Sequence, residues 1–515
     1  MSAPVLTAHP TDGPDAEDLR RIGYHQELHR RLGWFSSFAA GFSFVSILTT
    51  VFQLFALGYS FGGPAFFWTW PLVFAGQLCV ALVFAELAAS WPLAGCIYQW
   101  SRRLAGEIVG WFAGWAMLVG YIVSVAAIGI ALQAVLPAVW QGFQIIGTDP
   151  SVTSASGAAN GILLGSVLIA IATVISAVGV RFMAVINGIG VTCEIIGVVL
   201  LLVLLFSHTE RGPGVVTQTL NVSGDSPYVY AFLASTLMAA YVMYGFDSAA
   251  ELSEETSEPR RVVPSAILRA LLVSFVGGGF MIVAALMAAP SLTDGQLSAG
   301  GIAYVITSRL DSTLGRALLL VVAISIVSAC LAIQNSASRV MFSMARDGRL
   351  PGARLLARVH PQTGTPIITG IAVGVLAIAV LLINLGNPAA FAAVTSTSVV
   401  IVYLAYLLVT VPALRARLRR SMPSKRPGGF SLGRWGLPVN LFAVVYGVAM
   451  MVNIAWPRQA VYDPAGTSWL LQYLALLFVA GLVVVGLVVH RALRGRPTPA
   501  AVEAVVDAAA AVAEA

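Results

Sequence analysis

Three acidic residues lie at helical spacing where an apolar run ends. Asp247, Glu251 and Glu254 occupy positions i, i+4 and i+7 around the end of the apolar run 229–251, and Glu255 follows directly. A carboxylate inside a membrane is costly unless it is paired or solvated, so such residues usually mark a binding site or an ion path. The alternative is that the segment is simply the end of a span. That alternative fits Glu254 and Glu255 better than Asp247.

A fourth carboxyl, Glu194, lies within the apolar run 185–206, and no basic residue is near it in the sequence. Burial in a medium of low dielectric disfavours the charged form of a carboxyl, which makes it able to exchange a proton. We therefore expect either a proton or cation site, or a structural carboxyl that is hydrogen-bonded to a neighbouring helix. Ser325 and Ser328, at positions i and i+3 of another run, either face one cavity or serve helix packing.

Hydroxyl residues are concentrated in the run 36–60, which contains Ser43, Ser46, Thr49 and Thr50. Hydroxyl side chains can bond the backbone groups that are freed when a membrane helix breaks. The alternative is an unbroken helix whose hydroxyls bond back to its own turns.

The elements that must position these residues are membrane helices. The chain has 515 residues, of which 58% are hydrophobic and 10% are charged, whereas soluble domains contain about 25% charged residues. A helix that spans the bilayer core needs about 20 apolar residues. We predict twelve spans: 36–60, 66–90, 109–136, 159–180, 185–206, 229–251, 264–290, 317–342, 366–384, 389–412, 437–456 and 468–490.

The distribution of basic residues supports this count. With twelve spans and a cytoplasmic N-terminus, all of the 29 lysines and arginines lie in cytoplasmic segments except Arg211, Arg309, Arg316 and Arg458. This asymmetry is the one that the positive-inside rule predicts. We therefore expect both termini in the cytoplasm, and no cleavable leader, because the polar residues 1–31 contain no apolar core.

Composition also excludes other classes of protein. The net charge of +6 comes from short segments between apolar runs and not from a basic domain, so we expect no nucleic-acid partner. The 4 cysteines form no CxxC pair, and the 6 histidines lie near or outside the membrane edges without a cluster. The sequence therefore predicts no catalytic residues, no metal site and no cofactor, and a protein that is not an enzyme.

Three motifs in chain order resemble those of the amino acid–polyamine–organocation (APC) superfamily of permeases. The first is the run Glu86–Trp100, which reads ELAASWPLAGCIYQW. The second joins Gly245-Phe246-Asp247 to Glu254-Glu255 and Pro259-Arg260, and the third runs from Arg339 to Pro351 with ARDGRLP at its end. The resemblance covers the chain from Arg31 to about His490. The segments Gly41–Phe44 and Leu252–Glu255 are most similar to the amino acid/choline transporter branch.

The resemblance implies an all-α integral membrane protein with a LeuT-like fold, in which two repeats of five helices have inverted topology. The repeats would be residues 31–206 and 229–412, followed by two helices in 437–490. Residues 1–30 would form a cytoplasmic arm, and residues 491–515 an Ala-rich cytoplasmic tail.

Members of the family break the first and sixth helices at mid-membrane, where free helix ends bind the charged groups of the substrate. The resemblance therefore implies a substrate site built from these two segments. One departure concerns its shape, because Leu48-Thr49-Thr50 stands where many members have Gly-Ser/Thr-Gly. The implied substrate-binding residues are Ser43, Ser46, Ile47, Thr49 and Thr50 from the first helix, and Tyr241, Tyr244, Gly245 and Phe246 from the sixth.

The resemblance also implies a place for ion coupling. Many relatives have a lysine in the fifth helix, and alignment on Asn187 puts Glu194 at that position. We hypothesise that Glu194 binds and releases a proton, and that Ser325 and Ser328 form another wall of the same site. A sodium ion is the alternative.

For the cytoplasmic gate we predict ion pairs between Asp247, Glu254 or Glu255 and Arg339 or Arg346, with Glu86 at the same mouth. The alternative is that these arginines only set the topology.

The function that follows is that of a secondary active transporter in the cell membrane, not an enzyme, which imports amino acids or small amines by proton-coupled symport. The alternatives are an exchanger of amino acids or amines and a choline- or polyamine-type amine transporter. The partners expected are a small-molecule substrate, a proton or sodium ion and the lipid bilayer. The abundance of arginine and alanine favours a bacterial inner membrane.

Overall fold

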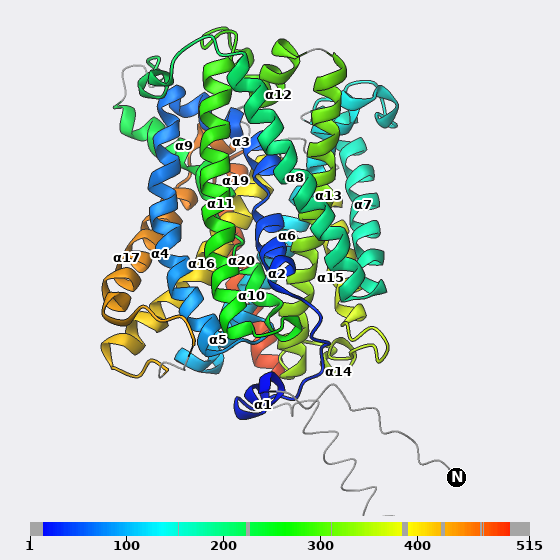
Figure 1. Cartoon of the computed structure of the whole chain (residues 1–515), viewed down its shortest axis with the longest axis vertical. Helices are drawn as coiled ribbons and strands as arrows, with labels where there is room; N and C mark the ends of the chain where they lie inside the picture. Colours follow the sequence, from blue (N-terminus) through cyan, green and yellow to red (C-terminus); the bar gives the residue numbers. More distant parts are fainter. Residues whose placement is uncertain are drawn as a thin grey trace, which may run out of the picture.

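The computed structural model shows a bundle of long helices that run roughly parallel to one axis (Figure 1). It describes residues 14–494 except 153, 223–226, 311, 384–389, 424–427, 464–465 and 467. The predicted tail beyond residue 494 and the first 13 residues of the predicted arm lie outside the described residues. Within the described residues the regular elements are helices. There is also one isolated parallel β-bridge, between Leu32 and Thr256.

The long helices agree with the apolar runs of the sequence. Ten helical segments are long and apolar enough to cross a membrane, and two shorter apolar helices, α9 and α15, coincide with the sixth and ninth predicted runs. The count of twelve spans stays a prediction. The helices of the bundle are α2 (Trp34–Val45), α3 (Ile47–Gly62), α4 (Thr69–Ser90), α6 (Glu107–Val139), α7 (Ala155–Val178), α8 (Val180–Ser207), α9 (Tyr228–Val242), α11 (Pro259–Ala288), α13 (Ser312–Arg346), α15 (Ile367–Leu382), α16 (Ala390–Leu418), α17 (Gly436–Ala455) and α20 (Leu474–Leu493).

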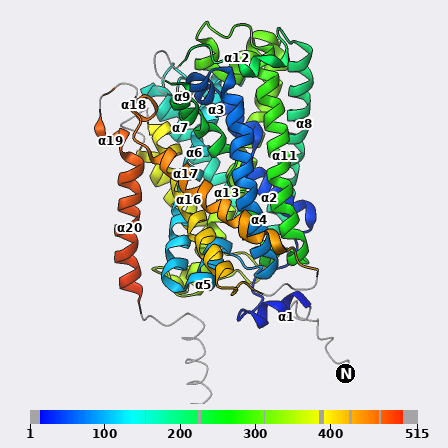
Figure 2. The same ribbon diagram turned by 90° about the vertical axis from the view of Figure 1, so that its left-hand side faces the viewer.

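Short helices join or cap these long ones. Helix α12 lies at one end of the bundle, and α1 lies beneath the other end (Figures 1 and 2). We call the end that carries α1, α5 and α14 the arginine-rich end. The short helices are α1 (Pro14–Arg21), α5 (Cys96–Ala105), α10 (Ser248–Glu251), α12 (Gln296–Arg309), α14 (Ala353–Leu356), α18 (Gln459–Tyr462) and α19 (Trp469–Gln472), and the 3-10 turns include η1 (Pro64–Trp68) and η4 (Ser253–Glu255).

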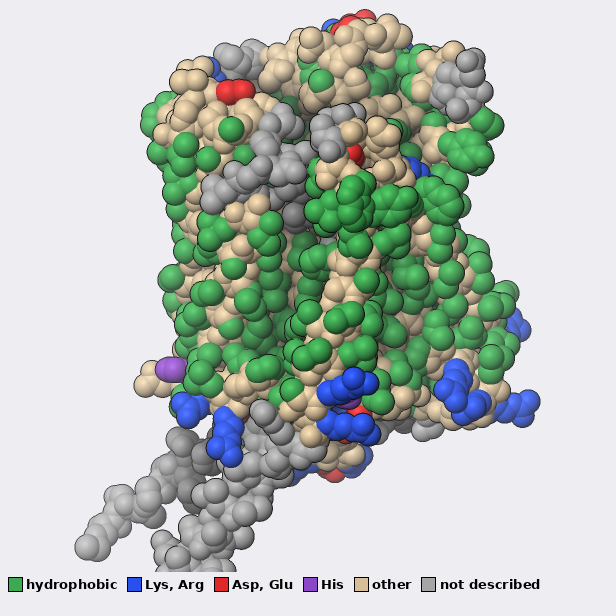
Figure 3. Space-filling view, turned by 180° about the vertical axis from the view of Figure 1, so that it is seen from behind, with side chains coloured by type: hydrophobic (Ala, Val, Ile, Leu, Met, Phe, Trp, Pro, Cys, Tyr) green, Lys and Arg blue, Asp and Glu red, His purple; other side chains and the backbone are tan. Residues whose placement is uncertain are grey.

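The surface of the bundle suits lipid and not water. Hydrophobic side chains cover much of the middle of the face that Figure 3 shows, and Lys and Arg side chains gather at the arginine-rich end of that face. Large apolar side chains such as Val174 on α7, Ile196 on α8 and Val488 on α20 are more than half exposed. Polar side chains, by contrast, are buried inside the bundle. This is the arrangement expected of a multi-pass membrane protein.

Helix α6 is the centre of the bundle and packs against α5, α7, α13 and α16. Small residues allow the closest approach. A Cβ atom built on Gly129 of α6 would lie 3.2 Å from the Cα atom of Gly165 on α7, so the two backbones are nearly in contact. Helix α20, in contrast, lies at the edge of the bundle (Figure 2).

Two of the predicted spans are interrupted near mid-height. The first is divided into α2 and α3 by Ser46, which has the left-handed backbone angles φ 36° and ψ 77°. The sixth is divided into α9 and α10 by residues 243–247, where Gly245 has a φ of 90°. These breaks place helix ends inside the bundle, and the candidate site is built around them.

Candidate functional site

The break between α2 and α3 is short, and most backbone groups around it make hydrogen bonds. The amide of Ser46 donates to the carbonyl of Phe42 (2.7 Å), and the amides of Thr49 and Thr50 both donate to the carbonyl of Ser46 (3.1 and 2.9 Å). The Thr50 hydroxyl donates to the carbonyls of Val45 and Ser46. The Thr50 hydroxyl therefore bonds backbone carbonyls at a break, and the run is not an unbroken helix.

Glu194 of α8 occupies the N-terminus of α3. Its Oε1 atom accepts a hydrogen bond from the backbone amide of Leu48 (3.1 Å) and lies 3.1 Å from the Ser46 hydroxyl. Ser46 Oγ also donates to Thr49 Oγ1 at 2.8 Å, and since a hydroxyl has one proton, it serves either Thr49 or Glu194 at a time. Glu194 is fully buried, and its Oε2 atom has no hydrogen-bond partner among the described residues.

The predicted serines of α13 are placed differently from each other. Ser328 Oγ lies 3.1 Å from Ser43 Oγ and donates to Asn187 Oδ1 at 3.0 Å, so it joins α13 to α2 and α8. Ser325 is buried, but it donates to the carbonyl of Val321 in its own helix. The structure gives neither serine a hydrogen bond to Glu194, because the acceptor atom of Glu194 is turned toward the end of α3.

The second break, at Gly245, requires a glycine. Besides its positive φ, a Cβ atom built on Gly245 would lie 1.8 Å from Cδ1 of Phe44, so no side chain fits there. The amide of Gly245 donates to the hydroxyl of Tyr406 (3.0 Å), and the Ser248 hydroxyl donates to the carbonyl of Ala40 (3.0 Å). The two broken helices are therefore in direct contact at their breaks.

Asp247 is held by tyrosines and not by arginines. Its Oδ2 atom accepts from the Tyr121 hydroxyl at 2.7 Å, and its Oδ1 atom accepts from the Tyr406 hydroxyl. Of the three carboxyls proposed as partners of Arg339 or Arg346, Asp247 is the one that bonds tyrosines instead. Asp247 is fully buried, and the nearest donors are the tyrosines that α6 and α16 present to the break.

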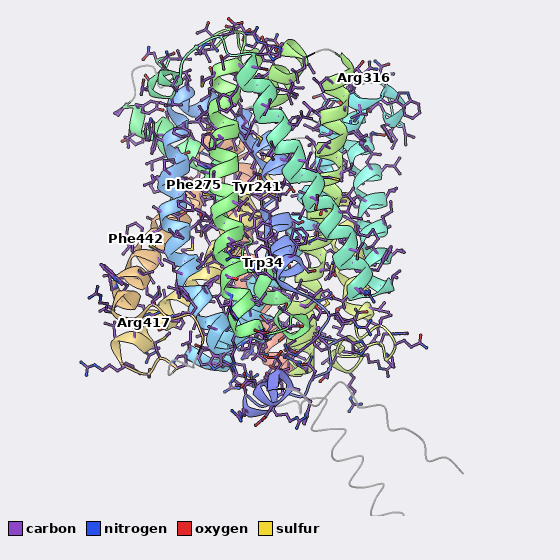
Figure 4. All side chains as sticks on the ribbon, viewed as in Figure 1. Trp34, Tyr241, Phe275, Arg316, Arg417 and Phe442 are labelled. Carbon is purple, nitrogen blue, oxygen red and sulfur yellow. The ribbon has the colours of Figure 1, made fainter. Side chains whose placement is uncertain are left out.

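Aromatic rings surround the breaks. The ring centroid of Phe44 lies 5.2 Å from that of Tyr121 and 5.8 Å from that of Tyr244, and Tyr241 makes an edge contact with Tyr244 at 5.5 Å. Tyr241 lies near the middle of the bundle (Figure 4) and is 8% exposed. Phe246 is turned away from these rings and packs against Tyr406 and Phe84, so it does not share their surface.

Two buried ion pairs lie between the breaks and the arginine-rich end. Glu255 accepts two hydrogen bonds from Arg339, at 2.9 and 3.2 Å, and Glu254 accepts two from Arg346, at 2.8 and 2.9 Å. All four side chains are less than a tenth exposed. Bidentate ion pairs of this kind fix the relative position of the segments that carry them, here η4 and α13.

Glu86 takes no part in these two ion pairs, although we predicted it at the cytoplasmic gate with them. It accepts hydrogen bonds from Arg417, which Figure 4 shows near the edge of the bundle, and from the amide of Leu432 (3.1 Å). Glu86 therefore ties α4 to the end of α16 and the loop that follows.

The described part of the N-terminal arm covers the two ion pairs. The Tyr24 hydroxyl lies 3.1 Å from the Asp347 carboxylate, and the Arg346 guanidinium stacks 4.3 Å above the Tyr24 ring. Burial, reinforced by the Asp347 carboxylate, raises the pKa of Tyr24 above its ordinary value, so the hydroxyl stays protonated and can donate. At the start of the arm, Asp18 accepts a hydrogen bond from Arg260 at 2.6 Å.

Cys96, Asp247 and Glu251 offer three ligand atoms within 4.8 Å of one another. The Cys96 thiol and amide both donate to Glu251 (3.1 and 3.2 Å), and Asp247 has its two tyrosines. Hydrogen bonds therefore account for these groups without an ion.

The sequence of most of the chain matches one family of proteins. The sequence pattern of the "Amino acid permease" family matches residues 32–485. The chain belongs to this family. It is a multi-pass transporter of the APC superfamily, not an enzyme, and its family places it among amino acid transporters.

Curated relatives whose names contain amino-acid permease match this chain over most of their length. "Amino-acid permease BAT1" of Arabidopsis thaliana is 29% identical over 491 residues, which is 91% of this chain and 92% of the relative. "Amino-acid permease BAT1 homolog" of Oryza sativa is also 29% identical, over 88% of this chain and 90% of the relative. "Uncharacterized amino-acid permease C74.04" of Schizosaccharomyces pombe is 26% identical, over 89% and 83%. These relatives are plant and fungal proteins, so they do not support the predicted bacterial inner membrane.

Several residues of this permease's site were not predicted. Tyr121, Ser124 and Tyr406 bond Asp247 or Tyr244, and Tyr24 and Asp347 lie over the ion pairs. Each of the first three is a hydroxyl residue inside an apolar run, but such residues are common in membrane helices, so the sequence does not single them out. Asp347 was part of a motif, but nothing in the sequence pairs it with the distant Tyr24.

Proposed function

We propose that this permease imports amino acids or small amines together with protons, as a symporter that works by alternating access. The observation that carries the proposal is the position of Glu194, a buried carboxyl without a counter-charge, at a helix end inside the bundle. A carboxyl there can be charged or protonated. A change between the two forms changes the charge next to the first turn of α3, which follows the break.

An inverted repeat is part of this proposal. We propose residues 31–206 and 229–412 as the two repeats, and each break then lies in the first helix of its repeat, at Ser46 and at Gly245. By the positive-inside rule, the arginine-rich end is the cytoplasmic end, and the arm lies in the cytoplasm. The membrane we propose is the cell membrane.

The helix ends indicate how a zwitterionic substrate is held. The N-terminus of α3 carries partial positive charge and favours a carboxylate, whereas the C-termini of α2 and α9 carry carbonyls that favour an ammonium group. The Tyr241 ring, next to the last residue of α9, adds a face for cation–π contact with the ammonium. Ser43, Ser46, Ile47, Thr49, Thr50, Tyr244, Gly245 and Phe246 remain the other candidate substrate residues, of which Phe246 faces away from the rings.

The ion pairs of Glu255 with Arg339 and Glu254 with Arg346 form the cytoplasmic gate in this proposal. They join η4, which follows the broken helix, to α13. Substrate leaves toward the cytoplasm only after these pairs separate. An exchanger would use the same gate, and it would differ in needing a second substrate for the return step.

The experiment that tests the substrate class is thermal stabilisation of the purified permease by a panel of compounds, each at an acidic and a neutral pH. A compound that binds the folded state raises its unfolding temperature by mass action. We expect stabilisation by one or more amino acids, stronger at acidic pH. Stabilisation only by cations such as choline or putrescine would instead show an amine transporter, and no stabilisation by any amino acid or amine would contradict the proposal.

A further inference from the structure

The N-terminus of α3 is already occupied by an anion that belongs to the protein. Helix α3 has 16 residues, and the amide of its second residue, Leu48, donates to Glu194 Oε1. The substrate carboxylate, in the function proposed above, needs this same helix end. A helix end attracts one negative charge, and two carboxylates side by side in a buried site repel each other strongly.

In the part of the chain that the structure describes, no charged group bonds Glu194 to offset its charge. The helices packed against α8 are α2, α3, α7, α11 and α13. None of their described titratable side chains makes a hydrogen bond or ion pair with Glu194, whose partners are Ser46 and the Leu48 amide. The groups in question are Tyr59 of α3, Arg260, Arg261 and Arg269 of α11, and Arg316, Cys330, Arg339 and Arg346 of α13, with Arg181 and Cys193 on α8 itself.

Three of these titratable side chains contact residues other than Glu194. Arg269 lies over the Trp34 ring, Arg260 is paired with Asp18, and Tyr59 donates to the carbonyl of Leu292. Arg316 lies near the end of the bundle opposite to the arginine-rich end (Figure 4). The charge on Glu194 is therefore balanced only by the helix end and by two hydrogen bonds.

The two oxygens of Glu194 have different surroundings. Oε1 holds both hydrogen bonds, whereas Oε2 is buried and has no partner among the described residues. A purely structural carboxylate would be expected to have both oxygens bonded, because an unsatisfied buried acceptor is costly. Oε2 is thus the atom that takes up a proton without breaking any contact.

We infer that Glu194 is a built-in competitor for the carboxylate of the substrate. This inference rests on the proposed function. With Glu194 ionised, its carboxylate holds the N-terminus of α3 and a substrate carboxylate is excluded. When Oε2 takes up one proton, Glu194 becomes neutral, and the substrate carboxylate takes over the helix end. Loss of the same proton expels the substrate carboxylate, so one proton is bound for each carboxylate bound.

The test compares an amino acid that binds with the amine that lacks only its α-carboxylate. We expect the Kd of the wild-type permease for the amino acid to rise about tenfold per pH unit above the titration range of Glu194, because one proton is linked to binding. The amine should show no such slope. Calorimetry in two buffers of different ionisation enthalpy should give about one proton taken up with the amino acid and none with the amine.

The decisive variant is Glu194→Gln, which keeps the shape of the side chain and removes its charge. It should bind the amino acid at all pH values as tightly as the wild type does at acidic pH, without proton uptake. The matched control is Glu210→Gln, whose carboxylate is 49% exposed at an outer loop and should leave the slope unchanged.

A slope that persists in Glu194→Gln overturns the inference, and so does an amine with the same slope as the amino acid. Proton uptake by the wild type is a sufficient test if the variant does not fold, since absence of uptake with the amino acid also overturns it. Binding that depends on sodium and not on pH overturns it as well. Failure of every amino acid and amine to bind would instead overturn the proposed function.

Discussion

At the scale of residues, Tyr406 connects more of the second break than any residue predicted from the sequence. Its hydroxyl accepts from the Gly245 amide and donates to Asp247 Oδ1, so it bonds two residues of the interruption between α9 and α10. Tyr121 supplies the second donor to Asp247. The break therefore keeps its shape through side chains of α6 and α16, which are far away in the sequence.

Replacing Tyr406 by Phe should impair transport because it removes both contacts and leaves a buried carboxylate with one donor fewer. We expect a loss of about 1–3 kcal/mol in the free energy of unfolding. The control is Tyr403→Phe, which removes a hydroxyl bonded to Gln77 and Tyr446, away from the break. Uptake of labelled substrate should fall more in the Tyr406 variant at similar stability, and equal uptake by the two variants would argue against this role.

Which residues could be predicted depended on how unusual they are in an apolar run. Gly245, Asp247 and Glu194 are visible because a helix in lipid needs neither a glycine nor a carboxyl. Tyr121 and Tyr406 are not, because tyrosine is common in membrane helices whatever it contacts. The bond from Glu194 to the Leu48 amide could not be predicted either, since a helix offers a free amide only where it begins, and the break at Ser46 was only one of two alternatives.

At the scale of elements, the limits of the helices agree with the predicted runs to within a few residues. The run 109–136 became α6, Glu107–Val139, and the run 437–456 became α17, Gly436–Ala455. Hydropathy determines these limits because the apolar length needed to cross a bilayer is fixed. The helix that covers Gln296–Arg309, α12, was not predicted, since it lies between spans and leaves no mark in hydropathy.

The gate that we propose involves two elements, η4 and α13, and it can be tested by exchanging charges. Arg339→Glu leaves Glu255 buried without its partner, which should cost about 3–5 kcal/mol and abolish transport. The double variant Arg339→Glu with Glu255→Arg should recover much of the lost stability and part of the uptake. The measurements are the unfolding temperature and the uptake of both single variants and of the double variant. A double variant with no higher unfolding temperature and no more uptake than either single variant would count against the gate.

At the scale of the whole molecule, ion pairs and the N-terminal arm join several segments at the arginine-rich end. The two ion pairs lie beneath the arm, which contacts three other parts of the chain through Asp18, Tyr24 and Arg30. The pairs and the arm together bring α11, α13 and η4 to one place. We expect import to require opening of this end, while Glu194 and the breaks lie farther inside the bundle.

The most direct test of the account is uptake of a labelled amino acid, chosen from the stabilising compounds, into liposomes that contain the purified permease. With the outside more acidic than the inside, the wild type should accumulate the amino acid above its external concentration. Glu194→Gln should lose this accumulation and still exchange internal for external substrate. Equal accumulation by the two proteins, or accumulation that needs no pH gradient, would contradict proton coupling through Glu194.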